Sequence, residues 1–310
     1  MWSVARTTLA AYALAITLPI AQAQEQAMTQ AMDPAASGHV EINGVDYHYQ
    51  IHGEGEPLLL LHGGLGTLDM FVPILPSLTA TRQVVAIDMH GHGRTPLGDR
   101  AINLVEMGGD LGRVIDTLGY EQIDVMGYSM GGGVAAQIAV QNPDLVRRLV
   151  LVSTPAAKDG FYPDIVNQMH QISAQVADAM RGTPMHEAYA AVAPVADDFP
   201  RLLDALGDMV RRPDVYELEV EKLTMPVMLI YGDGDMFRLE HVVEFYKRLG
   251  GGRGDAGWMR ENMPTNRLAI LPDLTHYEVF MSPVMVETAL RFLDGANSGP
   301  AWSQSEQTVR

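Results

Sequence analysis

A serine between two glycines is the clearest candidate for a chemically active residue. Residues 127–131 read GYSMG and follow the apolar run from Ile123 to Met126. A G-x-S-x-G pattern at a strand-to-helix junction places the serine hydroxyl on a sharp turn above a sheet edge. The mostly small residues 132–136 favour a closely packed helix whose N-terminal amides face developing negative charge. The pattern therefore predicts that Ser129 is a nucleophile in acyl transfer.

The segments around this turn alternate between short apolar runs and stretches of helical period, such as residues 103–118. This alternation predicts an α/β fold with a mainly parallel, doubly wound sheet that is buried on both faces. Near the N-terminus, Asn43-Gly44 separates two alternating segments, which predicts a β-hairpin. The expected buried strands cover residues 57–61, 83–87, 123–126, 149–152, 227–231 and 268–271.

Three further motifs resemble those of the α/β-hydrolase family. Residues 58–66 read LLLLHGGLG and resemble the strand and loop that supply the family's oxyanion hole. Residues 88–95 read DMHGHGRT and are similar to the family's D-x-R-G-x-G-x-S turn, with His90 where arginine is usual. Residues 232–235 read GDGD after a strand, as in the family's acid-bearing loop. The resemblance extends from Leu58 to Phe292 and implies the α/β-hydrolase fold.

The resemblance also assigns a base. Serine is a poor nucleophile until a neighbouring imidazole accepts its proton. Residues 271–277 read LPDLTHY and look like the family's loop that ends in the catalytic histidine. We therefore expect His276 to be the base for Ser129.

Two carboxylates are candidates for the acid that supports this base. Asp235 stands at the family's usual position, and Asp233 lies two residues earlier, so we prefer Asp235 and keep Asp233 as the alternative. The acid accepts the imidazole Nδ1–H and stabilises the imidazolium without taking the proton. Some family members carry the acid after the preceding strand, but here residues 153–156 read STPA and offer none.

The resemblance implies an oxyanion hole made from the backbone N–H groups of Gly64 and Met130, which would stabilise a tetrahedral intermediate. No cofactor and no metal are implied. The histidines and carboxylates lack the H-E-x-x-H spacing of a zinc site, and residues 63–66 lack the lysine of a phosphate loop.

We expect a hydrolase core of residues 24–154 and 224–296, with a helical cap at residues 155–223 inserted between two strands. Apolar residues of the cap recur at spacings of three and four, as on one face of a helix. Proline and glycine residues divide the insertion into about four short helices. Residues 297–310 have little apolar content and are expected to form a flexible tail. The recurring apolar residues are Ile165, Met169, Ile172, Val176 and Met180.

The first 23 residues have the pattern of a cleavable signal peptide. Arg6 is followed by an apolar run from Leu9 to Ile20, and Ala21-Gln22-Ala23 is a cleavage pattern that would leave Gln24 first. The apolar run is shorter than the roughly 20 residues of a membrane-spanning helix, which argues against a stable membrane anchor. We therefore expect a periplasmic or secreted protein.

Composition excludes several classes of function. The net charge of −17 makes the surface repel nucleic-acid phosphates, so DNA and RNA are not expected partners. The chain has no cysteine, which excludes disulfides, thiolate metal sites and a cysteine nucleophile.

The motifs together predict an exported serine hydrolase that cleaves small-molecule carboxylic esters, or related lactones or thioesters, through an acyl-enzyme. The same triad also serves carbon–carbon bond hydrolysis or cofactor-free perhydrolysis. A third alternative is a catalytically silent small-molecule binding protein. Haloalkane dehalogenase and epoxide hydrolase chemistry needs a carboxylate at the turn, so Ser129 argues against both.

Overall fold

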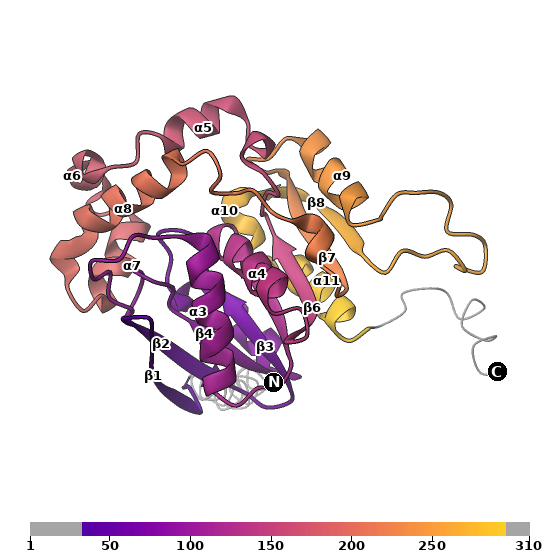
Figure 1. Ribbon diagram of the computed structural model, residues 1–310, viewed down its shortest axis with the longest axis horizontal. Helices are drawn as coiled ribbons and strands as arrows, with labels where there is room; N and C mark the ends of the chain where they lie inside the picture. The colour runs from indigo at the N-terminus through magenta and orange to yellow at the C-terminus, as the bar shows by residue number, and fades with distance from the viewer. Residues whose placement is uncertain (1–32, 296–310) are drawn as a thin grey trace, which may run out of the picture.

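One eight-stranded sheet with helices on both faces forms the centre of the molecule (Figure 1). The computed structural model describes residues 33–295. The strand order is β1-β2-β4-β3-β5-β6-β7-β8, and all neighbours from β4 to β8 are parallel. The predicted mainly parallel sheet is confirmed. The strands are β1 (Ala36–Ile42), β2 (Val45–His52), β3 (Glu56–Leu61), β4 (Arg82–Ile87), β5 (Ile123–Tyr128), β6 (Val146–Val152), β7 (Val227–Gly234) and β8 (Arg267–Thr275).

The predicted hairpin joins β1 and β2 at one edge of the sheet. Asn43 and Gly44 form its turn with φ angles of 52° and 79°. Positive φ at both central residues is the requirement of a type I′ turn, which Asn-Gly satisfies at low cost. The turn sets the antiparallel register, with Ile42 opposite Val45.

Alternate residues of the inner strands enter two separate hydrophobic cores. In β3, Leu59 and Leu61 belong to one core, whereas Leu58 and Leu60 belong to the other. Both faces are therefore apolar, and strands of this kind read as continuous rather than alternating apolar runs. The first core includes residues of α3 (Leu104–Thr117), α4 (Met130–Gln141) and α9 (Leu239–Arg248), and the second includes residues of α2 (Leu75–Thr79), α10 (His276–Val279) and α11 (Pro283–Leu293).

Four short helices occupy the interval between β6 and β7, at one end of the sheet (Figure 1). Leu202 of this group lies close to Gly91, which follows β4, so the group borders the carboxyl ends of the strands. The division into core and cap domains stays a prediction. The helices are α5 (Pro163–Met169), α6 (Ala177–Met180), α7 (Pro184–Val192) and α8 (Phe199–Arg211), and the 3₁₀ turns of the chain are η1 (Leu68–Phe71), η2 (Lys158–Gly160), η3 (Ala174–Val176), η4 (Ala196–Asp198) and η5 (Val220–Lys222).

The spacing of the apolar residues from Ile165 to Met180 had indicated one continuous helix. The structure instead divides these residues between shorter segments. Helix α5 ends at Met169, and the chain then crosses α8 so closely that a Cβ on Gly207 would lie 2.0 Å from the Ile172 carbonyl oxygen. The Arg211 guanidinium donates to this oxygen at 3.0 Å. At this crossing the Ile172 carbonyl oxygen has a hydrogen-bond donor although it lies outside a helix. The apolar side chains still pack on the first core.

Two predicted segments, the signal peptide at residues 1–23 and the tail at residues 297–310, lie outside the described residues. Between residues 33 and 295, no helix combines the length and apolar character needed to cross a bilayer. The segment from Gly250 to Asn266 contains no helix or strand and joins α9 to β8 as a long loop (Figure 1).

Candidate active site

Ser129 occupies the sharp turn between β5 and α4. Its φ is 54°, a left-handed conformation that is uncommon for any residue other than glycine. The turn is possible because its neighbours lack side chains: a Cβ on Gly127 would lie 2.3 Å from the Gly131 carbonyl oxygen, and a Cβ on Gly131 would lie 2.3 Å from the His62 carbonyl oxygen. The predicted strand–serine–helix geometry is therefore present.

His276 begins α10, directly after β8, and its imidazole reaches Ser129. The His276 Nε2 and Ser129 Oγ atoms are 3.0 Å apart, which is a hydrogen-bond distance. The His276 residue is 4% exposed, so the contact is shielded from bulk water.

Asp235 lies on the other side of the same imidazole, just after β7. Its Oδ1 is 2.9 Å from His276 Nδ1, and it also accepts the Met236 N–H at 2.8 Å. The carboxylate can only accept, so Nδ1 carries the proton and Nε2 is left to accept from the serine. The alternative, Asp233, does not contact His276; its Oδ1 faces the Leu274 N–H at 3.4 Å.

The two residues predicted for the oxyanion hole lie next to each other beside Ser129. Met130 is the first residue of α4, where backbone N–H groups have no partner within the helix. A Cβ on Gly64 would lie 3.8 Å from the Met130 Cβ. The structure thus brings all five predicted site residues together, and their catalytic roles remain predictions.

His62 fixes the peptide that carries the Gly64 N–H. Its Nδ1 donates to the Gly63 carbonyl oxygen at 2.7 Å, and its Nε2 accepts the Met89 N–H at 3.0 Å. Because a trans peptide is planar, holding the Gly63 oxygen on one side turns the Gly64 N–H to the opposite side. Both ring nitrogens are used in this way only by the neutral imidazole.

The hydroxyls of Tyr128 and Ser153 also contact the triad, and neither residue was singled out from the sequence. The Tyr128 hydroxyl donates to the His276 carbonyl oxygen at 2.8 Å, and the two rings lie 5.2 Å apart. Burial raises the pKa of Tyr128, so its hydroxyl stays protonated and continues to donate. The Ser153 hydroxyl donates to Asp235 Oδ2. In the sequence, Tyr128 and Ser153 are marked only by their positions close to the ends of predicted strands.

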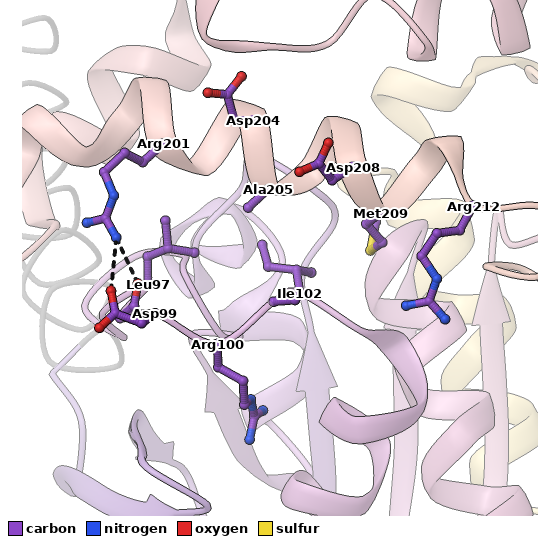
Figure 2. Close-up of a pocket in the computed structure, with 12 residues that line it drawn as sticks. Leu97, Asp99, Arg100, Ile102, Arg201, Asp204, Ala205, Asp208, Met209 and Arg212 are labelled. Atoms are coloured by element: carbon purple, nitrogen blue, oxygen red, sulfur yellow. Dashed lines mark hydrogen bonds and ion pairs between the residues drawn. The ribbon is translucent and has the colours of Figure 1, made fainter.

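Figure 2 shows an open cleft of about 430 Å³ between α8 and residues 97–102. Its charged side chains are largely paired within the protein: Arg201 donates to the Gly98 carbonyl oxygen at 2.9 Å, and Asp204 accepts the Ala174 N–H at 2.7 Å. None of the triad side chains lines this cleft. The cleft therefore marks the border between the inserted helices and the core, and it is separate from the predicted site.

Comparison with known proteins identifies the fold. The model of the alpha/beta hydrolase fold matches residues 56–184. A solved structure, E-2-(acetamidomethylene)succinate hydrolase, aligns with a TM-score of 0.64 at 19% identity, over 84% of this chain and 99% of that one. The chain has the α/β-hydrolase fold.

Two relatives show how far the similarity of the sequence extends. A protein of Azorhizobium caulinodans named as a carbamate hydrolase is 38% identical over 118 residues, which cover 37% of this chain and 44% of that protein. The chain thus spans less than half the length of this relative. A pimeloyl-(acyl-carrier protein) methyl ester esterase of Neisseria meningitidis is 27% identical over 241 residues, which cover 71% of this chain and 88% of the esterase.

The turn at residues 88–95 departs from the family's motif by His90, and its structure is nevertheless fixed by Asp88. The Asp88 carboxylate accepts the N–H groups of Leu68 at 2.8 Å and Arg94 at 2.9 Å. Burial alone would raise the pKa of Asp88, but hydrogen bonds from His48 and these amides outweigh it and hold the pKa below its usual value. Asp88 thereby ties the turn to the segment after the oxyanion loop.

Buried neutral histidines surround this carboxylate. His92 donates from Nδ1 to the His90 carbonyl oxygen at 3.0 Å, and its ring lies 5.3 Å from the His62 ring. Burial, with a contribution from His62, lowers the pKa of His92 to about 3. Burial also lowers the pKa values of His62 and His90.

We expect these histidines to make the fold acid-sensitive. In the unfolded chain a histidine binds a proton near pH 6.5; His92 in the folded chain does so only near pH 3. The unfolded state therefore gains a proton first as the pH falls below 6.5, and each such histidine removes up to about 1.4 kcal/mol of stability per pH unit. Urea unfolding of the wild type and of His92→Gln between pH 7.5 and 4.5 tests this. The variant should lose stability less steeply with acid, and equal slopes would contradict the assignment.

Proposed function

We propose that this α/β-hydrolase is an exported serine hydrolase that cleaves carboxylic esters, or closely related lactones or thioesters, through an acyl-enzyme. One observation carries the proposal: Ser129 Oγ, the His276 imidazole and Asp235 Oδ1 form a continuous hydrogen-bonded chain with distances of 3.0 and 2.9 Å. The relatives named as a methyl ester esterase and a carbamate hydrolase support hydrolysis at an acyl carbon.

Acylation uses each of the assembled groups. Ser129 Oγ attacks the carbonyl carbon of the ester while His276 Nε2 takes the hydroxyl proton. The carbonyl oxygen becomes an oxyanion between the N–H groups of Gly64 and Met130, and preorganised donors of this kind are worth about 3–4 kcal/mol each. Asp235 stabilises the imidazolium. The intermediate then collapses, the C–O bond to the alcohol breaks, and His276 returns the proton to the departing alkoxide oxygen.

Deacylation repeats these steps with water. His276 Nε2 takes a proton from a water molecule, whose oxygen attacks the acyl carbon. The second oxyanion occupies the same two N–H groups. Its collapse breaks the bond to Ser129 Oγ, which regains the proton from His276, and the carboxylic acid leaves.

The bond that is cleaved can be decided with a panel of substrates. It should contain p-nitrophenyl esters of increasing chain length, lactones, thioesters and a vinylogous 1,5-diketone. Preferential turnover of the diketone would replace the ester proposal by carbon–carbon hydrolysis with the same triad.

Replacing the nucleophile should abolish hydrolysis. We expect Ser129→Ala to lower kcat by about 10⁴-fold or more, because the members of a triad act as one unit. The melting temperature should change little, since only a hydroxyl is removed. A fluorophosphonate probe should label the wild type and fail to label the variant. A variant that keeps a tenth of the wild-type turnover would refute Ser129 as the nucleophile, and an unlabelled wild type would favour a silent binding protein.

The two aspartates after β7 provide a matched pair for the acid. We expect Asp235→Asn to lower kcat by about 10⁴-fold, because an amide stabilises the wrong imidazole tautomer. Asp233→Asn removes the same charge two residues away and should retain most activity, since Asp233 does not contact His276. Steady-state kinetics of both purified variants decides the assignment; the reverse order of severity would transfer the role to Asp233.

We propose export because of the sequence that precedes the hydrolase core. Arg6, the apolar run from Leu9 to Ile20 and the Ala21-Gln22-Ala23 pattern support cleavage by a signal peptidase. N-terminal sequencing of the protein made from the full chain in a bacterial host should find Gln24 at or near the first position, in the periplasmic or medium fraction. Protein that still begins at Met1 in a membrane fraction would contradict export as a cleaved, soluble enzyme.

A further inference from the structure

We infer that Ser153 is a positioning residue of this active site, whose hydroxyl holds the Asp235 carboxylate in the orientation that presents Oδ1 to His276. The inference rests on the proposed function, because it assigns a task to a residue that acts through the triad. Ser153 directly follows β6, the neighbour of β7 in the sheet.

The contacts of Asp235 divide unequally between its two oxygens. Oδ1 accepts from His276 Nδ1 at 2.9 Å and from the Met236 N–H at 2.8 Å. Oδ2 accepts from the Ser153 hydroxyl and, at 3.4 Å, from the Gly232 N–H. Without the hydroxyl, Oδ2 would keep only this long contact, although the carboxylate side chain is 3% exposed. A buried anionic oxygen with one poor donor is costly, so the carboxylate would turn to find others.

The backbone at Ser153 has a conformation that favours glycine. Its φ is 49°, in the left-handed region where glycine is the residue of lowest cost. The Ser153 N–H nevertheless continues the ladder to β7 by donating to the Ile230 carbonyl oxygen at 2.8 Å, so the conformation is fixed. The residue is also completely buried. Glycine would adopt this φ at lower cost, but it would lack the hydroxyl. Strain of this kind, observed beside a candidate active site, points to a function for the strained residue.

The hydroxyl acts on the transition state rather than on substrate binding. When His276 takes the serine proton, the carboxylate must stay charged and in plane with the Nδ1–H to stabilise the imidazolium. A neutral hydroxyl donor on Oδ2 supports that charge without competing for Oδ1. Because Ser153 is buried behind Asp235, it has no access to substrate. Its removal should therefore lower kcat and leave KM unchanged.

The decisive variant is Ser153→Gly in the full chain. We expect kcat to fall by about 10- to 100-fold, the effect of one hydrogen bond to a charged group, with KM unchanged. The melting temperature should change little, because the relief of the positive φ by glycine opposes the loss of the hydrogen bond to buried Asp235. Ser153→Ala also lacks the hydroxyl but keeps the strained Cβ, so it should lose the same activity while being less stable than Ser153→Gly. Activity that followed stability across the two variants would overturn the inference.

A double variant tests whether the hydroxyl works through Asp235. In an Asp235→Asn background, Ser153→Gly should cause little further loss of kcat, because the carboxylate that it orients is already gone. If Ser153 had only a structural role, the fold-losses in kcat of the two single variants would multiply in the double variant. Arg260→Gly is a control for the relief of a positive φ alone, because it replaces a loop residue with a φ of 63°. This variant should leave kcat and KM unchanged.

Failure of the inference and failure of the proposed function give different results. If Ser129→Ala is inactive and Ser153→Gly retains wild-type kcat, the triad stands and Ser153 is not a positioning residue. If Ser129→Ala retains activity, the proposed function itself is wrong, and the kinetics of Ser153→Gly no longer bear on a triad.

Discussion

A carboxylate that is nearly excluded from water must be surrounded by hydrogen-bond donors, and this constraint organises the catalytic edge of the sheet. Asp235 takes its donors from three strand ends: Ser153 after β6, Gly232 and Met236 on β7 and just beyond it, and His276 after β8. Parallel strands bring such residues to the same edge although they are far apart in the sequence. The sheet order places β7 between β6 and β8, so the acid is enclosed from both sides.

The turn at Ser129 depends on the same arrangement, because it follows β5, the other neighbour of β6 in the sheet. The Ser129 N–H donates to the Val152 carbonyl oxygen at 2.9 Å, and the Thr154 hydroxyl contacts the Ser129 carbonyl oxygen at 3.2 Å. The end of β6 therefore contacts both the serine turn and, through Ser153, the acid. Tyr128, the residue before Ser129, also contributes, because its hydroxyl donates to the main-chain carbonyl oxygen of His276. Nucleophile, base and acid are thus linked by backbone as well as by side-chain contacts.

Much of this arrangement could be predicted because it depends on local sequence. Apolar runs set the strands, Asn43-Gly44 set the hairpin, and the glycines around Ser129 allowed the turn. The choice of Asp235 over Asp233 came from a family spacing, and the structure places only Asp235 against His276.

The remainder depends on contacts between distant segments. The break after Met169 could not be predicted from spacing, because it is stabilised by Arg211 and by the close approach at Gly207, both on another helix. Ser153 carries no motif, since its importance lies in the carboxylate that it meets across the sheet.

The left-handed conformations of Ser129 and Ser153 have a consequence for the stability of the fold. Each strained residue costs about 1–3 kcal/mol, an appreciable part of a typical net stability of about 5–15 kcal/mol. Glycine would adopt either backbone conformation at lower cost, but it carries no hydroxyl. At Ser153 the hydrogen bond to the buried Asp235 carboxylate offsets part of this cost. The packing of the rest of the fold must therefore supply enough stability to hold both turns in place.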